Sequence, residues 1–204
     1  PFTDHKDLGE KKSRIIAKAN GVYIYDVDDN EILDAMSGLW CVNAGYGRSE
    51  LADAAAEQLR ELPYYNSFFQ CANPPSIELA QMLKEVTQPH LNRVFYTGSG
   101  SESIDTMIRI VRRYWEVMGE PERKTIIARK NAYHGSTIAG VSLGGMNPMH
   151  SQGGPLLPGI EHIDQPYWFD SDRSLPPAEF GIKMAGQLEE KILQLGAENV
   201  AAFV

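Results

Sequence analysis

The chain has 204 residues, of which 43% are apolar and 23% are charged, and these proportions are ordinary for a globular protein. Its formal net charge of −8 argues against a protein that binds nucleic acid through a basic face. Cys41 and Cys71 are too few for a disulfide framework, and no apolar run is long enough to span a bilayer, so we expect a cytoplasmic protein without membrane segments.

The N-terminal part of the chain is expected to form a β-hairpin. Residues 21–27 alternate in polarity and carry aromatic and β-branched side chains, which is typical of a half-buried strand. Residues 28–30 are turn formers, and residues 31–34 resume the strand pattern. A loop rich in Gly, Trp and Asn follows at 37–48 and leads to Ser49, the expected N-cap of the next helix.

The rest of the chain alternates segments of helical and strand periodicity. In chain order the pattern predicts a helix at 49–61, a helix at 74–86, a strand at 93–97, a helix at 102–118, a strand at 125–129, long loops at 135–177, a helix ending at 195 and a strand from 200. Strands separated by helices need crossover connections, so the expected fold class is α/β with a mostly parallel central sheet.

The chain stops inside the apolar run 200–204, with no turn residue after it. This pattern is typical of a buried strand that continues into a loop. We therefore expect the chain to be a portion of a longer protein.

The glycine-rich segment TGSGSE at 97–102 connects an expected strand to an expected helix. Such a turn directs backbone amides and the positive end of the helix dipole at one point, which favours a phosphate. The third glycine of the dinucleotide fingerprint is missing, and no Walker lysine or Gly-x-Ser-x-Gly elbow is present. The alternative is a tight turn that serves only to cap the helix.

Tyr133 and His134 follow the expected strand at 125–129. The carboxyl ends of parallel strands line the ligand crevice of an open sheet, and an aromatic side chain there offers a flat face to a planar ring. Tyr-His pairs also occur as hydrogen-bonded core residues. Combined with the glycine-rich turn, the pair indicates a ligand that has both a phosphate and an aromatic ring.

Several aromatic residues fall outside helical periodicity and are candidates for a substrate pocket, an interface or ordinary packing: Phe2, Trp40, Tyr64, Tyr65, Phe68 and Phe69. The histidines His134, His150 and His162 follow no ligand spacing, so no metal site is expected. Cys41 has no recognisable histidine partner and is expected to be a small buried thiol.

Together these motifs resemble the class III (fold type I) pyridoxal-phosphate aminotransferases, the ω-transaminases, over essentially the whole chain. The segments that carry the resemblance are LDAMSGLW at 33–40, FYTGSGSE at 95–102 and AYHG at 132–135. Further segments resemble the branch that uses diamines and pyruvate: PFTDH at 1–5, CVNAGYG at 41–47 and GVSLGGM at 140–146.

The resemblance implies a fold type I PLP-dependent transferase, with a mostly parallel central sheet, helices on both of its faces and a small α+β N-terminal segment. It implies pyridoxal 5'-phosphate as cofactor, with Tyr133 stacked on its ring, and the following cofactor-binding residues: Ser99, Gly100, Ser101, Tyr133, His134 and Gly135. The substrate pocket that it implies consists of Phe2, Trp40, Phe68, Phe69 and Tyr133. The family usually has Ala-Asn after the glutamate of the turn, whereas this chain has Ser103-Ile104. We expect local repacking there, without loss of cofactor binding.

The same resemblance assigns residues 1–62 to the N-terminal segment of a small domain and 63–204 to the first part of a large cofactor-binding domain. It places the Schiff-base lysine beyond Val204, so no catalytic residue is expected in this chain. Lys124 and Lys130 are near the corresponding strand, but neither fits the position of that lysine in the family. The 204-residue chain alone is therefore expected to be inactive.

The full protein is expected to be a homodimer that transfers an amino group from a putrescine-like primary amine to pyruvate, giving an aldehyde and alanine. The alternatives are another fold type I enzyme, with a different amine and keto acid or acting as an aminomutase or decarboxylase, and a non-catalytic domain.

Overall fold

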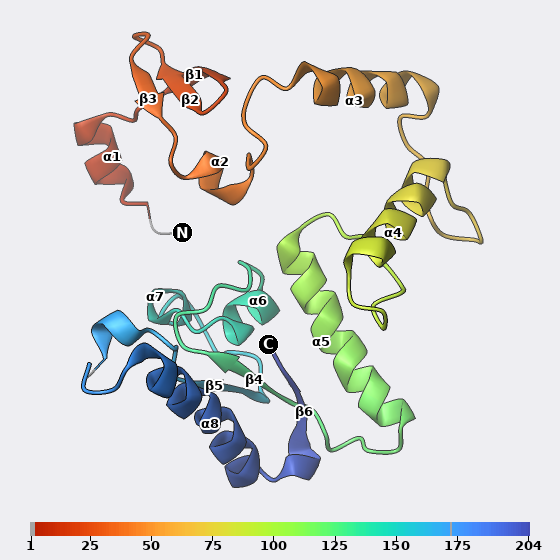
Figure 1. Cartoon of the computed structure of the whole chain (residues 1–204), viewed down its shortest axis with the longest axis vertical. Helices are drawn as coiled ribbons and strands as arrows, with labels where there is room; N and C mark the ends of the chain where they lie inside the picture. The colour runs from red at the N-terminus through yellow and green to blue at the C-terminus, as the bar shows by residue number, and fades with distance from the viewer. Residues whose placement is uncertain (1–2, 172) are drawn as a thin grey trace. The chain divides into compact units, whose positions relative to one another are not determined.

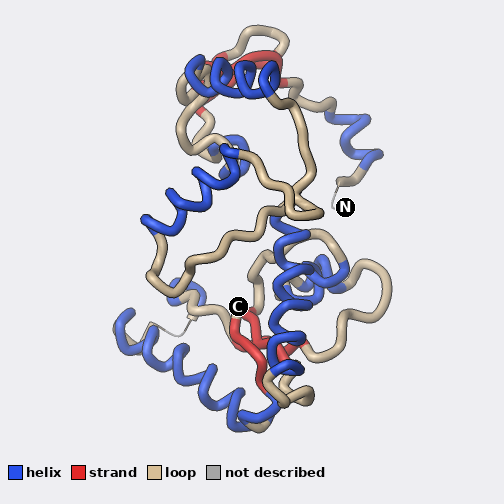
Figure 2. Tube along the Cα trace, turned by 90° about the vertical axis from the view of Figure 1, so that its right-hand side faces the viewer, coloured by secondary structure: helices blue, strands red, loops and turns tan. Residues whose placement is uncertain are grey.

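The structure is a computed structural model that describes residues 3–171 and 173–204 (Figure 1). These residues fall into two compact units that divide between Asn92 and Arg93. Helices make up most of the regular structure in both units (Figure 2). No described helix is both long and apolar enough to cross a membrane.

The first unit is built from short elements joined by loops. They are α1 His5–Lys11, β1 Ile16–Asn20, β2 Tyr23–Asp26, β3 Glu31–Leu33, α2 Ser37–Trp40, α3 Ser49–Glu61 and α4 Pro74–Val86. The strands pair antiparallel in the order β1-β2-β3, which confirms the predicted hairpin and adds β1 and α1, which the sequence pattern did not reveal. None of the described residues of this unit is buried. The prediction of a buried thiol at Cys41 is therefore wrong, because this residue lies in an exposed turn.

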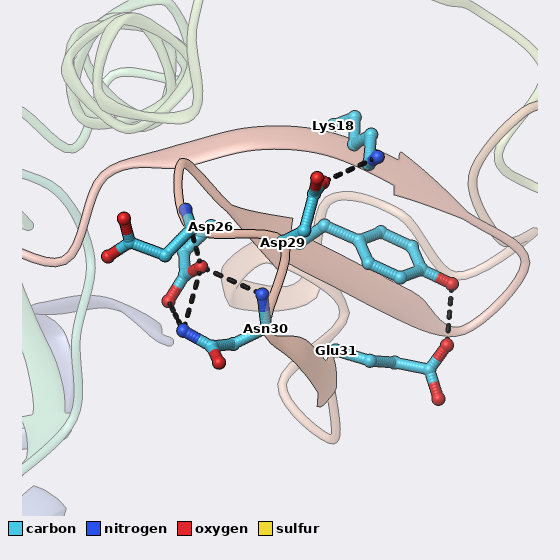
Figure 3. Close-up of polar contacts among 7 residues, drawn as sticks. Lys18, Asp26, Asp29, Asn30 and Glu31 are labelled. Atoms are coloured by element: carbon cyan, nitrogen blue, oxygen red, sulfur yellow. Dashed lines mark hydrogen bonds and ion pairs between the residues drawn. The ribbon is translucent and has the colours of Figure 1, made fainter.

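The hairpin turn between β2 and β3 is organised by the carboxylate of Asp26 (Figure 3). Asp26 Oδ1 accepts hydrogen bonds from the amides of Asp28 and Asn30, both at 3.0 Å, and the Asn30 side chain donates to both carboxylate oxygens. Hydrogen bonds from Asn30 lower the pKa of Asp26 below its usual range. An ion pair between Lys18 and Asp29 at 2.7 Å joins β1 to the same turn.

The two longer helices of this unit begin differently. The N-cap of α4 is Asn73, whose Oδ1 accepts from the Ser76 amide at 3.1 Å, and prolines occupy the first helical positions. The prediction of Ser49 as the N-cap of α3 is wrong by one residue, because Ser49 already has helical geometry and Arg48 is the cap.

The second unit is an α/β structure. Its elements are α5 Gly100–Val117, β4 Thr125–Arg129, α6 Ile138–Leu143, α7 Asn147–His150, β5 Ile160–Ile163, the 3₁₀ turns Trp168–Asp170 and Ala197–Asn199, α8 Pro177–Leu195 and β6 Val200–Phe203. The strands pair parallel in the order β5-β4-β6.

Alternate residues of β4 point to opposite faces of this sheet. Ile126 and Ala128 pack with Ile108 of α5 and Leu143 of α6. Ile127 packs on the other face, against apolar residues that include Leu188 of α8. Helices therefore cover both faces, which confirms the predicted α/β fold class (Figure 1).

Two sequence-based predictions for this unit are wrong. Residues 93–97 form no strand, because this short apolar run is not buried in the sheet: residues 93–96 are exposed, and Phe95 is 70% exposed. The stretch 135–177 contains α6, α7 and β5 rather than loops alone. Strand β5 is not evident from the sequence pattern because Glu161 and His162 interrupt its apolar residues. In the structure Glu161 forms an ion pair with Lys191, and His162 forms hydrogen bonds with backbone carbonyls.

Candidate functional site

The N-terminus of α5 is shaped by the glycine-rich turn. Ser99 is its N-cap, and Ser99 Oγ accepts from the Glu102 amide at 3.2 Å. Glu102 Oε2 reaches back to accept from the Gly98 amide at 2.8 Å. The amides of Gly100 and Ser101 lie in the first turn, where an α-helix offers no carbonyl partner. A Cβ on Gly100 would meet nothing within 4 Å, so this helix end is open to a ligand.

Two hydroxyls brace the turn from within. Thr97 Oγ1 lies 2.5 Å from Ser103 Oγ, and Ser103 Oγ donates to the Ser99 carbonyl at 3.2 Å. Ile104 packs on the core around Ile126, as expected for the apolar helix face. The Ser103-Ile104 pair is thus accommodated by a polar brace on one side and an apolar contact on the other.

The segment after β4 is held in place by its own backbone. Asn131 has a left-handed conformation with φ 62°, its amide donates to the Gly145 carbonyl at 2.9 Å, and the Gly145 amide donates to the Ala132 carbonyl at 2.9 Å. Only glycine fits at 145, because a Cβ there would lie 2.2 Å from the Arg129 carbonyl oxygen. This close pairing fixes the loop that presents Tyr133, whose side chain is 61% exposed.

The two segments singled out by their sequence meet in space. The Ser136 amide donates to Ser101 Oγ at 3.0 Å. Gly135 has φ +130°, and a Cβ on it would lie 2.7 Å from the same oxygen. Because Ser101 accepts this bond, its hydroxyl proton is available to a further acceptor. Thr137 Oγ1 strengthens the junction by donating to Asp105 Oδ1 at 2.6 Å, a contact that the sequence alone did not indicate.

His134 directly precedes Gly135 in the chain, and its Nε2 is buried without a hydrogen-bond partner among the described residues. Burial, and to a lesser degree the neighbouring His162, lower the pKa of His134, so the ring is neutral at pH 7. His150 and His162 both place Nε2 at hydrogen-bond distance from the Gly144 carbonyl, at 2.7 and 2.9 Å. Within the described ranges, no three His, Cys, Asp or Glu side chains are grouped to hold a metal ion.

The expected pocket residues are distributed over both units. Trp40 lies in α2 and is 76% exposed, and the rings of Phe68 and Phe69 are 6.3 Å apart; all three belong to the first unit. Tyr133 belongs to the second unit, and Phe2 lies outside the described residues. Their role in a substrate pocket stays a prediction, whereas Ser101, Gly135 and Ser136 are brought into direct contact.

Comparison with known proteins identifies the family. The aminotransferase class-III family model matches residues 7–204. The chain belongs to the class-III aminotransferases. It is 59% identical to putrescine–pyruvate aminotransferase of Pseudomonas aeruginosa over 204 residues, which are 100% of this chain and 45% of that protein. The chain thus spans about half the length of the curated relatives that it matches.

Solved class-III aminotransferases share the fold. An (S)-enantioselective omega-transaminase from Thermomicrobium roseum superposes with a TM-score of 0.93 at 38% identity, over 100% of this chain and 45% of that one. A PLP-bound amine transaminase from an uncultivated Pseudomonas species gives a TM-score of 0.89 at 33% identity, over 100% and 46%. The fold is therefore fold type I, and the cofactor of this family is pyridoxal 5'-phosphate.

The residues present fit that cofactor. An open helix N-terminus, flanked by two serines whose hydroxyl protons are free to donate, suits a phosphate dianion. The exposed ring of Tyr133 offers an apolar face of the size of a pyridine.

Proposed function

We propose that this protein, at the full length of its relatives, transfers the amino group of a putrescine-like primary amine to pyruvate, giving an aldehyde and alanine. The choice of substrates is supported by the 59% identity to an enzyme named for putrescine and pyruvate. The single structural observation that supports a cofactor-dependent reaction is the hydrogen bond from the Ser136 amide to Ser101 Oγ, which joins the glycine-rich turn to the segment that carries Tyr133.

In this proposal Ser99, Gly100 and Ser101 bind the cofactor phosphate through backbone amides and hydroxyls. Tyr133 covers one face of the ring, and Gly135 keeps the space beside Ser101 free of a side chain. The cofactor, when bound, supplies the electron sink that makes the substrate C–H bond acidic. His134 supports the loop as a neutral ring, so it adds no positive charge next to the phosphate turn.

We assign no catalytic residue to this chain. Lys130 pairs with Asp164 at 2.6 Å and Lys124 with Glu122 at 3.1 Å, so each amine is engaged in a surface ion pair. The resemblance places the family's cofactor-linked lysine after Val204, and we propose that the 204-residue chain alone does not transaminate.

The remaining assignments follow the same resemblance. We propose that the protein is a cytoplasmic homodimer that acts in polyamine catabolism, with residues 1–62 in the small domain and 63–204 in the cofactor domain. Its substrate pocket is lined by Phe2, Trp40, Phe68, Phe69 and Tyr133.

The test is amine-dependent alanine formation from pyruvate, measured with a protein of the relatives' full length. Ser101→Ala is expected to weaken cofactor affinity about 10- to 100-fold, because it removes a hydrogen bond to a charged group. Ser49→Ala, at the exposed start of α3, serves as the matched control and leaves affinity unchanged. Absence of alanine with every diamine and aralkylamine would remove this proposal in favour of another fold type I reaction or a non-catalytic domain.

A further inference from the structure

The helix α2 turns the opposite way to an ordinary helix. Ser37, Gly38, Leu39 and Trp40 have φ values of 49°, 59°, 63° and 66°, so the segment is one left-handed turn. This conformation is unfavourable for residues that carry a side chain, and three of these four do. Leu39 and Trp40 are 61% and 76% exposed, so burial does not offset the strain.

One carboxylate holds this turn. Asp34 Oδ2 accepts from the Gly38 amide at 2.7 Å, and Oδ1 accepts from the Met36 amide at 3.2 Å. The Tyr46 hydroxyl donates to the same Oδ2 at 2.7 Å. These bonds, the one from Tyr46 above all, lower the pKa of Asp34, so the carboxylate is charged at neutral pH.

We call Asp34 and Tyr46 the clamp of this turn, and it is connected to the antiparallel sheet by hydrogen bonds. Tyr46 exchanges backbone hydrogen bonds with Gly21, at 2.8 and 3.2 Å, and Gly21 lies between β1 and β2. The space around Gly38 is also restricted. A Cβ on it would lie 2.9 Å from Val42 Cγ2 and 3.0 Å from the Tyr46 hydroxyl.

Beyond the clamp, backbone bonds support the turn without determining its hand. The Trp40 amide donates to the Met36 carbonyl at 2.8 Å, and the amides of Cys41 and Val42 both donate to the Ser37 carbonyl at 2.9 Å. Bonds of this spacing also form in right-handed turns. The carboxylate of Asp34 is the side-chain group that accepts from amides at the start of this turn, those of Met36 and Gly38.

We propose that Asp34 is a positioning residue: its carboxylate keeps residues 37–40 left-handed and thereby fixes the direction in which the Trp40 side chain projects. Backbone strain that surrounding bonds maintain is characteristic of sites that hold a ligand-contacting side chain in one orientation. The inference rests on the proposed function in one respect, namely that Trp40 contacts the amine substrate.

The test compares Asp34→Ala, Trp40→Ala and the double variant in the full-length protein. Asp34→Ala is expected to lower kcat/KM for the amine about 10- to 100-fold, the effect of a small misplacement of a contacting group. In the Trp40→Ala background the same change is expected to have less than a twofold effect, because Asp34 acts through Trp40. Equal effects in both backgrounds would overturn the proposal.

Asp26→Ala is the matched control, since Asp26 also organises a turn by accepting backbone amides but makes none of its bonds to residues 37–40. It is expected to leave kcat/KM unchanged. Tyr46→Phe and Asp34→Asn remove only part of the clamp and are expected to give intermediate losses, which keeps the proposal testable if Asp34→Ala fails to fold.

A readout without substrate separates this inference from the proposed function. The Trp40 fluorescence anisotropy, taken as the difference between proteins with and without Trp40→Phe, is expected to fall in Asp34→Ala and to stay constant in Asp26→Ala. A fall in a protein that forms no alanine would sustain the positioning role and reject the transaminase proposal. Alanine formation with anisotropy unchanged by Asp34→Ala would do the reverse.

Discussion

The two units of the chain owe their order to different forces. In the second unit Ile126, Ile127 and Leu143 are fully buried, and helices cover both faces of a parallel sheet. The described residues of the first unit include no buried side chain, and its turns are set by the carboxylates of Asp26 and Asp34. Substitutions should therefore act mainly on packing in the second unit and on local hydrogen bonds in the first.

The exposed apolar side chains of the first unit also indicate that its described residues form little core. Leu51 and Leu59 of α3 are 58% and 60% exposed, and Phe69 is 91% exposed. Apolar side chains as exposed as these contribute little buried area to the unit that carries them. Local polar bonds thus define the conformation of this unit without supplying a core.

The largest difference in stability is expected when a buried side chain is removed from the second unit and an exposed one from the first. Ile127→Ala is expected to lower the free energy of unfolding by about 2–5 kcal/mol, because it leaves a cavity beneath α8. Leu33→Ala, at a side chain that is 60% exposed, is expected to change it by less than about 1 kcal/mol. Urea unfolding measures both, and equal losses would refute the difference between the units.

Gly145→Ala tests the close backbone pairing behind Tyr133. The new Cβ would collide with the Arg129 carbonyl and with Lys130, so we expect a loss of about 1–3 kcal/mol and weaker cofactor binding. The control is Gly181→Ala in α8, where a Cβ meets nothing within 4 Å and is expected to stabilise by about 0.5–1 kcal/mol. Thermal unfolding and cofactor titration distinguish the two variants.

The two units should respond to acid in different pH ranges. The pKa of His134 is lowered in the folded chain, so the unfolded chain takes up the proton first, and the second unit loses stability as the pH falls below about 6.5. The pKa values of Asp26 and Asp34 are also lowered, so their contribution persists above about pH 4 and is lost as these carboxylates become protonated.

Hydrogen exchange followed segment by segment checks this separation. His134→Gln is expected to remove the pH dependence between about pH 5 and 7 in the second unit alone. Unchanged exchange in that variant would mean that another group carries the effect.

The smallest effect is expected at the ion pair between Lys18 and Asp29. Both side chains are largely exposed, so Lys18→Met should change the free energy of unfolding by less than about 0.5 kcal/mol. A larger loss would show that exposed ion pairs contribute substantially to the stability of the first unit.

Local pattern was enough to predict the elements whose side chains follow one simple rule. Strand β4 is a short apolar run, α8 repeats apolar residues every three or four positions, and the turn at 28–30 lies between two alternating segments. Gly196, directly after α8, has a φ of 82°, a conformation that glycine adopts readily.

What the sequence could not predict depends on contacts between distant residues. The bond from Ser136 to Ser101 joins positions 35 residues apart, and β5 becomes recognisable only when Lys191 and the carbonyls near Gly144 are seen to satisfy its polar side chains. The left-handed turn at 37–40 contains one glycine, and the bonds to Asp34 that hold it are visible only in three dimensions.

The carbonyl of Gly144 has one more consequence, for proton placement. A carbonyl oxygen only accepts hydrogen bonds, so the two imidazoles that approach it, those of His150 and His162, must each carry their hydrogen on Nε2. When neutral, both rings are therefore fixed as Nε2–H tautomers with the lone pair on Nδ1. The Gly144 carbonyl, together with those of Val141 and Leu143, thus sets the tautomer of two histidines, which nitrogen-15 chemical shifts would record directly.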